Sequence, residues 1–533
     1  MTQIKIYDTT LRDGTQSEEI NLSVQDKVRI TRKLDDLGVH YVEGGWPGSN
    51  ATDKEFFKEI QNYAFKSCKI SAFGSTHMNR LTPEKDPNLA ALIDSGAKAM
   101  SIFGKSWDFH ATHALGVTLE RNIELISNSI GYLRPHVEEL FFDAEHFFDG
   151  FKANPEFTLS CLRAAYEAGA DVLVLCDTNG GSMPEEVAES CRAVLEKIPG
   201  CKIGIHAHND CDLAVANSLT AVKNGAVQIQ GTMNGYGERC GNANLCSIIP
   251  NLELKLGYET IGRKKLTKLK ETSTYVTEIA NLRPFLRQPF VGQAAFAHKG
   301  GVHVSAVLKD STSYEHIDPL LVGNDRRVLL SDLSGKSNVL YKAKQFGYDL
   351  DKNDPAVQTI LADIKERETI GFEYSAAEAS FELLFFKAMG WSKRYFEFIN
   401  FFVVDAKRKH DDEPFSEATV IVKVHGQENH TAASGEGPVN ALDKALRKAL
   451  EPFYPSLKEV RLQDFKVRVL SGAVRQASGT SSNVRLLIES TDGKSQWTTM
   501  GVSHNIIEAS WQALVDSINY KLFKDDPQKW PSL

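Results

Sequence analysis

Two histidines near the middle of the chain have the type and spacing needed for metal chemistry. His206 and His208 end the stretch 202–208, Lys-Ile-Gly-Ile-His-Ala-His, which predicts an extended strand. Side chains two positions apart on a strand share a face, so both imidazoles point the same way. Imidazole nitrogen is a common ligand of divalent metals. The pair predicts half of a metal site, the alternative being a polar strand end that hydrogen-bonds to loops.

These histidines need a scaffold, and strand-like runs alternate with amphipathic helical patterns from about residue 4 to residue 257. The expected strands are 4–8, 39–43, 69–74, 99–104, 139–145, 171–177, 202–208 and 226–232. A doubly wound sheet would need fewer units and a glycine-rich phosphate turn after its first strand, where this chain has Thr-Thr-Leu-Arg-Asp-Gly. Eight units therefore predict a (β/α)8 TIM barrel.

Polar residues follow most of these strands, and barrel active sites lie at the carboxyl ends of the strands. The residues concerned are Arg12, Asp13, Glu43, Glu145, His146, Asp177, Thr178, Asn179, His206, His208 and the segment 234–242. Each of them alone is compatible with a helix cap or a loop hydrogen bond. Together they predict a single polar site at one rim of the barrel.

Asp13, the two histidines and a carbonyl such as that of Asn242 form an oxygen and nitrogen ligand set. Without a thiolate, such a set suits Mg, Mn, Co or Zn with open positions for a substrate. A metal that chelates a 2-oxo acid polarises its ketone as a Lewis acid. Arg12 is then placed to stabilise the developing alkoxide, the alternative being an ion pair with Asp13 on the barrel rim.

Three motifs carry a family resemblance. Residues 7–16 (Tyr-Asp-Thr-Thr-Leu-Arg-Asp-Gly-Thr-Gln), 206–210 (His-Ala-His-Asn-Asp) and 234–243 resemble those of the 2-isopropylmalate, homocitrate and citramalate synthases. Residues 43–50 and 142–150 resemble the citramalate synthase branch. Many relatives have glutamate where this chain has Thr15, which puts a role for that carboxylate in doubt but not the metal. The resemblance covers nearly the whole chain and implies a metal-dependent barrel that condenses acetyl-CoA with a 2-oxo acid.

The resemblance also implies roles for individual residues. Asp13, His206 and His208 would be metal ligands, with Asn242 as a fourth, while Arg12, Glu145 and Thr178 would contact the 2-oxo acid with Gln16 nearby. In the segment 290–303, His303 occupies the position of a histidine that reaches into a barrel, often the partner subunit's, and helps to deprotonate the acetyl-CoA methyl group. Tyr314 follows closely. A histidine suits such a proton transfer; the alternative is a histidine that holds a glycine-rich turn.

The second half of the chain differs in pattern. We expect a catalytic barrel over 1–262, helical linker subdomains over 263–394 and an α/β domain over 395–533. The last domain contains a near-repeat, because two strand-like runs precede each of two strand–turn–helix segments that begin at 429 and 496. Such duplicated βββα units build a pocket with two-fold symmetry. They resemble the leucine- or isoleucine-binding regulatory domain of these synthases, the alternative being a plain dimerisation module.

Composition places the protein in a broad class. A hydrophobic content of 42%, a charged content of 24% and a net charge of −8 give no reason to expect nucleic acid as a partner. Eight cysteines without a C-x-x-C pair suit reduced thiols. No signal peptide and no membrane-spanning run is evident, so we expect a cytoplasmic protein and no membrane partner.

The leading hypothesis is an acyltransferase that condenses acetyl-CoA with pyruvate to (R)-citramalate, as a homodimer inhibited by isoleucine. The alternatives within the class are a 2-isopropylmalate or homocitrate synthase. Phe73, Phe103 and Asp143 on the barrel wall are candidates for setting the 2-oxo acid. A catalytically silent regulator is a third hypothesis, against which the intact set of metal ligands and Arg12 argue.

Overall fold

The computed structural model describes residues 3–330, 334–391, 393–407, 410, 413–470 and 482–526. They fall within two compact units, one over Met1–Phe296 with His316–Arg326 and the other over Ala297–Glu315 with Arg327–Leu533. Each unit is described by itself. Across the described ranges, every helix is too short or too polar to cross a membrane.

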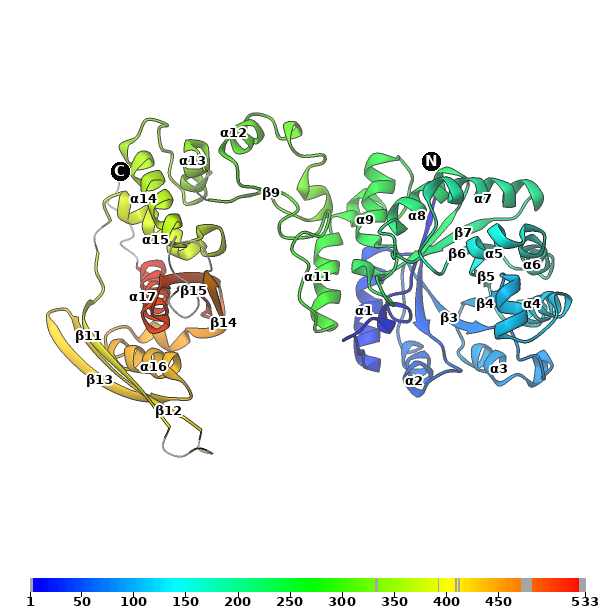
Figure 1. Cartoon of the computed structure of the whole chain (residues 1–533), viewed down its shortest axis with the longest axis horizontal. Coiled ribbons are helices and arrows are strands. Elements are labelled where there is room, and N and C mark those ends of the chain that lie inside the picture. The colour runs from blue at the N-terminus through cyan, green and yellow to red at the C-terminus, as the bar shows by residue number, and fades with distance from the viewer. Residues whose placement is uncertain are drawn as a thin grey trace. The chain divides into compact units, whose positions relative to one another are not determined.

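The first unit is built on a closed barrel of eight parallel strands (Figure 1). The sheet closes where β1 pairs with β8, with Lys5 opposite Gln228, while the other side of β1 pairs with β2. The strands are β1 (Lys5–Asp8), β2 (Tyr41–Gly45), β3 (Lys69–Ser75), β4 (Ala99–Lys105), β5 (Glu139–Glu145), β6 (Val172–Asp177), β7 (Ile203–Ala207) and β8 (Gln228–Gly231). The predicted TIM barrel is confirmed.

Helices surround the barrel, and their ends follow local sequence signals. At the start of α1, the Ser23 side chain accepts from the Asp26 amide while the Asp26 carboxylate accepts from the Ser23 amide, and Gly38 ends the helix with φ 96°. The helices are α1 (Val24–Leu37), α2 (Ala51–Ile60), α3 (Pro87–Asp94), α4 (Leu119–Leu133), α5 (Phe147–Ala153), α6 (Pro155–Glu167), α7 (Pro184–Lys197), α8 (Ala214–Lys223), α9 (Leu245–Pro250), α10 (Arg263–Leu266) and α11 (Leu269–Ile279).

Two apolar layers hold this unit together. Large side chains between the sheet and the helices form the main core. Inside the barrel, the rings of Tyr7, Tyr41 and Phe141 pack mutually, with centroids 5.2–5.8 Å apart. Losing a buried aromatic ring of this kind typically costs about 3–5 kcal/mol of unfolding free energy. This aromatic group is linked to the polar residues of the rim, because the Tyr7 hydroxyl donates to Glu43 Oε2 at 2.7 Å.

The second unit contains two three-stranded antiparallel sheets, each followed by a helix (Figure 1). The first repeat is β11 (Glu397–Ala406), β12 (Phe415–Val424), β13 (Gln427–Gly435) and α16 (Pro438–Leu450). The second is β14 (Arg461–Leu470), β15 (Asn483–Thr491), β16 (Gln496–Ser503) and α17 (Ile506–Asp525). The predicted duplication of βββα units is confirmed.

The part of this unit that precedes the repeats is mainly helical. It consists of β9 (Ala297–His298), α12 (Gly301–Lys309), β10 (Arg327–Val328), α13 (Lys336–Gln345), α14 (Pro355–Ile370) and α15 (Glu378–Ala388). The helices α13, α14 and α15 share the core of the two repeats. Phe386 on α15 packs on Phe523 of α17, with ring centroids 4.6 Å apart, and one buried cluster runs from Leu330 to Phe523. The domain boundaries at residues 262/263 and 394/395 stay predictions.

Candidate active site

A cavity of about 260 Å³ lies at the carboxyl ends of the barrel strands. Seven of the ten residues predicted for the site line it: Arg12, Asp13, Gln16, Glu145, Thr178, His206 and His208. Phe73, Phe103 and Asp143, expected on the barrel wall, line it too. Segments far apart in the sequence are thus brought to one rim by the strand order of the barrel.

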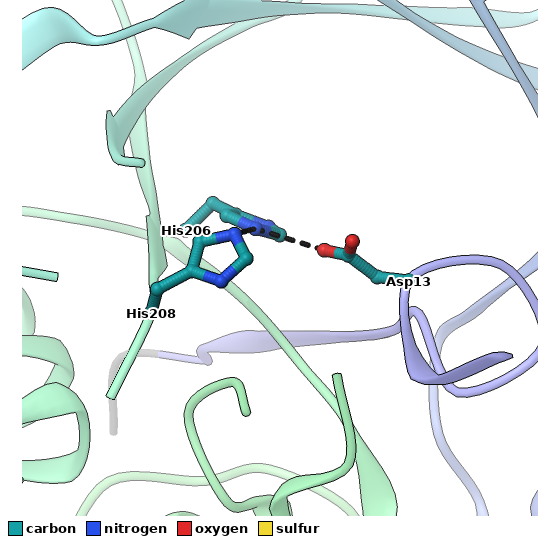
Figure 2. Close-up of side chains that lie close together, drawn as sticks. All are labelled: Asp13, His206 and His208. Atoms are coloured by element: carbon teal, nitrogen blue, oxygen red, sulfur yellow. Dashed lines mark hydrogen bonds and ion pairs between the residues drawn. The ribbon is translucent and has the colours of Figure 1, made fainter. Parts of the chain in front are cut away.

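Asp13, His206 and His208 lie close together (Figure 2), and all three line this cavity. His206 Nε2 lies 3.1 Å from Asp13 Oδ2 and 3.4 Å from His208 Nε2. The three side chains are buried, and one ligand atom from each lies within 4.8 Å of the others. The predicted shared face of the two histidines is confirmed, since His206 on β7 and His208 just after β7 both direct their imidazoles toward Asp13, in the turn that follows β1.

The charges in this group are strongly coupled. Burial opposes ionisation of Asp13, but the Arg12 charge and the hydrogen bond with His206 outweigh it and hold the pKa of Asp13 well below its usual value. Burial also disfavours a charged His206, yet its contact with Asp13 raises the pKa of His206. For His208, burial and the nearby His206 lower the pKa to about 4. His208 is therefore neutral near neutral pH, the form that ligates a metal.

Arg12 connects the metal-ligand group to an aromatic wall of the cavity, formed by Trp46, Phe73 and Phe103. Its Nη1 lies 3.0 Å from Asp13 Oδ1, and its Nε donates to Glu43 Oε1 at 2.6 Å. The guanidinium carbon stands 3.8 Å from the centroid of the Phe73 ring. Two carboxylates and a stacked ring fix the fork, so its outward donors are preorganised toward the cavity. The ion pair between Arg12 and Asp13, given above as the alternative role of Arg12, is present, and both residues also line the cavity.

Asn242 enters from the loop after β8. A single antiparallel bridge pairs it with His208, and its Nδ2 donates to Asp13 Oδ2 at 2.6 Å. The amide thus presents its NH2 group to the carboxylate, while its buried Oδ1 lacks a hydrogen-bond partner. Asn242 belongs to the group, but its part as a fourth ligand stays a prediction.

Further hydrogen bonds orient the histidine ligands. Gln230 on β8 bonds to His206 Nδ1 through its Oε1 at 2.9 Å and donates to Asp143 Oδ1 at 3.0 Å. Ser101 also donates to that oxygen of Asp143, at 2.8 Å. His208 Nδ1 is buried without a hydrogen-bond partner. Two inward-facing imidazoles, one ionised carboxylate and a supporting chain of this kind fit a divalent cation.

Sequence comparisons agree with this geometry. The HMGL-like family model matches residues 3–276, the homocitrate synthase post-HMGL domain-like model matches 290–371 and the LeuA allosteric (dimerisation) domain matches 375–522. The (R)-citramalate synthase of Geobacter sulfurreducens is 56% identical over 99% of both chains, and that of Aquifex aeolicus is 53% identical over 99% of both. The chain belongs to the (R)-citramalate synthase family. A 2-isopropylmalate synthase of Methanocaldococcus jannaschii is 30% identical, covering 98% of this chain and 95% of its own.

The residues that the resemblance assigns to contact with the 2-oxo acid line the cavity at the rim of the barrel. Glu145 forms an ion pair with Lys105 of the neighbouring strand. The Thr178 hydroxyl accepts from the His146 backbone amide at 2.9 Å, which links the ends of β5 and β6. His146 has φ 55°, and Gln16 is exposed at the cavity edge. Their contacts with substrate stay predictions.

His303 and Tyr314 belong to the second unit, and neither is among the residues of the first unit that line the barrel cavity. Their rings stack, with centroids 4.2 Å apart and planes inclined at 26°. Both side chains are exposed. A histidine and a phenol are therefore already paired as one group, and their expected part in proton transfer stays a prediction.

Several residues that shape the site escaped sequence reasoning about individual positions. Gln230 is one of several polar residues on β8, and Lys105 gave no signal beyond its position at a strand end. Trp46 belongs to the stretch 43–50 that resembled this family, yet only the structure places it in the cavity lining. Glu238 and Arg239 also line the cavity. The register between neighbouring strands decides which of these side chains meet, and that register cannot be read from the sequence.

Proposed function

We propose that this chain condenses acetyl-CoA with pyruvate and water to give (R)-citramalate and CoA. The observation that carries the proposal is the meeting of the Asp13–His206–His208 group, the Arg12 guanidinium and an aromatic wall in one small cavity. A divalent cation held by the three ligands would chelate the 2-oxo acid and polarise its ketone. Membership of the (R)-citramalate synthase family supports the assignment of pyruvate.

The chain's own residues have distinct parts in this reaction. A base removes a proton from the methyl group of acetyl-CoA, the new carbanion forms a bond to the ketone carbon of pyruvate, and water then cleaves the thioester to release CoA. The Arg12 donors stabilise the negative charge that develops on the ketone oxygen. We assign the proton removal to His303 with its stacked partner Tyr314, and Glu145 to contact with the substrate at the rim.

Pyruvate is favoured over larger 2-oxo acids because the relatives at 53–56% identity over 99% of both chains are (R)-citramalate synthases. The apolar part of the cavity, with Phe73 and Phe103 in its lining, suits a short alkyl group. The 2-isopropylmalate synthase alternative retains support from the relative at 30% identity. A homocitrate synthase would need space for a second carboxylate chain.

The deciding experiment measures CoA release with pyruvate, 2-oxoisovalerate and 2-oxoglutarate in parallel, with Mg, Mn, Co and Zn each supplied separately. We expect pyruvate to give the highest kcat/KM and a chelator to abolish turnover. His206→Ala is the matched inactive variant, and His136→Ala, an exposed histidine outside the cavity, is its control. Preference for 2-oxoisovalerate would assign the alternative, and no CoA release with any acid would refute the enzyme proposal.

We also propose a cytoplasmic homodimer regulated through its second unit. The match of residues 375–522 to an allosteric dimerisation domain supports both regulation and assembly. Isoleucine is the expected inhibitor because citramalate formation precedes the synthesis of that amino acid. All eight cysteines are free thiols and six are buried, which suits a reducing compartment.

A further inference from the structure

An aromatic wall forms the apolar part of the cavity, together with Cys176. Phe73 and Phe103, from the neighbouring strands β3 and β4, are stacked with centroids 5.5 Å apart and planes inclined at 18°. Trp46, just after β2, stands edge-on to both, with centroids 5.8 Å from Phe73 and 5.7 Å from Phe103. Such edge-to-face contacts give aromatic clusters a defined geometry.

We propose that Trp46 sets the upper size limit for the side chain of the 2-oxo acid. This inference rests on the proposed function and adds a specificity-determining residue to it. The indole lines the cavity next to the Phe73–Phe103 stack and stands edge-on to both rings. In this proposal the indole leaves room for the methyl group of pyruvate and excludes a branched side chain.

The polarity of the lining determines which end of the substrate meets this wall. The carboxylate and ketone of a 2-oxo acid are drawn to Asp13, the two histidines and the Arg12 guanidinium, where charge and hydrogen bonds compensate their desolvation. The remaining group of the acid is its alkyl side chain. Burial against the aromatic rings is the favourable placement for it, since apolar surface gains when it leaves water.

Trp46 is fixed from two directions, so it acts as a rigid boundary. Its indole Nε1 donates to Asn88 Oδ1 at 2.5 Å, and Asn88 in turn donates to the Ser75 carbonyl at 2.9 Å. Its backbone amide donates to Asp53 Oδ2 at 2.8 Å. Gly45 permits that contact, because it has φ 141° and a Cβ there would lie 2.3 Å from the Asp53 carboxylate carbon.

Trp46 can also be changed without removing a charged group's support. Phe73 carries the Arg12 guanidinium at 3.8 Å, and Phe103 lies 5.5 Å from the Lys105 ammonium. A substitution of either phenylalanine would disturb a charge as well as the wall. The ring contacts described for Trp46 are those with the two phenylalanines, so its replacement enlarges the cavity and leaves the catalytic charges in place.

The test compares kcat/KM for pyruvate, 2-oxobutyrate and 2-oxoisovalerate in wild type, Trp46→Phe and Trp46→Leu. One methylene in an apolar pocket is worth about 10–200-fold in discrimination. We expect Trp46→Leu to change the 2-oxoisovalerate-to-pyruvate ratio at least about tenfold in favour of the larger acid, with Trp46→Phe between it and wild type. Asn88→Ala, which releases the indole, should shift the ratio in the same direction by less.

Tyr63→Leu is the matched control, because Tyr63 is a half-buried aromatic in the same unit outside the cavity. Its ratio should equal that of wild type. An unchanged ratio in folded Trp46→Leu, or a change confined to the KM of acetyl-CoA, would overturn the inference. The wild-type protein separates the two kinds of failure. If it releases CoA with pyruvate, only the role of Trp46 is refuted; if neither it nor any variant releases CoA, the proposed function fails. If Trp46→Leu does not fold, Trp46→Phe and Asn88→Ala decide.

Discussion

Gln230 fixes the orientation of His206, because its side-chain oxygen lies 2.9 Å from Nδ1 of the imidazole. An amide oxygen can only accept, so Nδ1 carries a proton in both charge states of the ring, and Nε2, which faces Asp13, becomes the ligand atom once its own proton has left. Gln230 is itself held by its donation to Asp143. Such a partner behind a metal ligand sets both the ring orientation and its basicity.

Replacing Gln230 should therefore weaken metal binding while leaving every ligand present. We expect Gln230→Leu to lower affinity for the activating metal about 10–100-fold, measured by calorimetry on metal-free protein. Gln228→Leu is the control, since Gln228 is a buried glutamine on the same strand and outside the cavity lining. Equal affinities in Gln230→Leu and wild type would show that the ring is oriented by other contacts.

The extent to which sequence anticipated this site depends on the kind of contact. The alternation of a strand was enough to place His206 and His208 on one face, and the order of strands placed Asp13 beside them. Gln230 was not predictable, because Gln228 has the same residue type and alternation, and only the register of β7 against β8, with His206 opposite Gln230, separates the two. The orientation of the Trp46 indole likewise depends on Asn88, which lies on α3, after the next strand of the barrel.

Metal affinity should fall as the pH is lowered, and His206 should account for most of the dependence. In the metal-free protein Asp13 is ionised and His208, with a pKa of about 4, is neutral, so neither has a proton to lose near neutral pH. The raised pKa of His206 means that its proton must leave before the nitrogen can bind metal. Below that pKa, affinity should drop roughly tenfold per pH unit, with roughly one proton released per metal bound.

Calorimetry in two buffers of different ionisation enthalpy measures that proton release directly. Raising the pH should increase affinity until His206 is neutral in the free protein, and no further. Affinity that stays constant between about pH 6 and about pH 8 would mean that the His206–Asp13 contact does not hold a proton in this range.

Arg12→Lys should reduce kcat and leave metal binding nearly unchanged. Lysine keeps the positive charge, but it cannot contact Asp13 and Glu43 at once while lying flat on Phe73, as the guanidinium does. Loss of one oxyanion donor typically lowers the rate about 10²–10³-fold. Steady-state kinetics with metal analysis of the purified variant test this, and an unchanged kcat would reduce Arg12 to a structural ion pair.

Apolar residues on the edge strands of the second unit should mediate self-association. Phe402 and Val404 on β11 are 61% and 56% exposed, and Val469 on β14 is 54% exposed. Exposed apolar patches on sheets of this kind mark interaction surfaces. We expect Phe402→Glu to weaken the proposed dimer, measured as molar mass by light scattering after gel filtration. Leu308→Glu, at an exposed apolar position on α12, is the control, and a dimer that persists unchanged in Phe402→Glu would place the interface elsewhere.

Isoleucine should inhibit the full-length protein by binding to its second unit. The experiment requires the whole chain, because Tyr520 on α17 donates to Glu382 of α15 at 2.8 Å and the core continues into α13–α15, so a fragment cut near residue 395 would lose part of its interior. Couplings between allosteric sites are typically about 1–3 kcal/mol, or about 5–150-fold in affinity.

Thermodynamic linkage requires pyruvate to weaken isoleucine binding by the factor by which isoleucine weakens pyruvate binding. Calorimetric titration with isoleucine, leucine and valine, each with and without pyruvate, measures both sides. Isoleucine affinity that is independent of pyruvate would contradict inhibition through substrate binding, and binding of none of the three amino acids would leave assembly as the role of the duplicated βββα units.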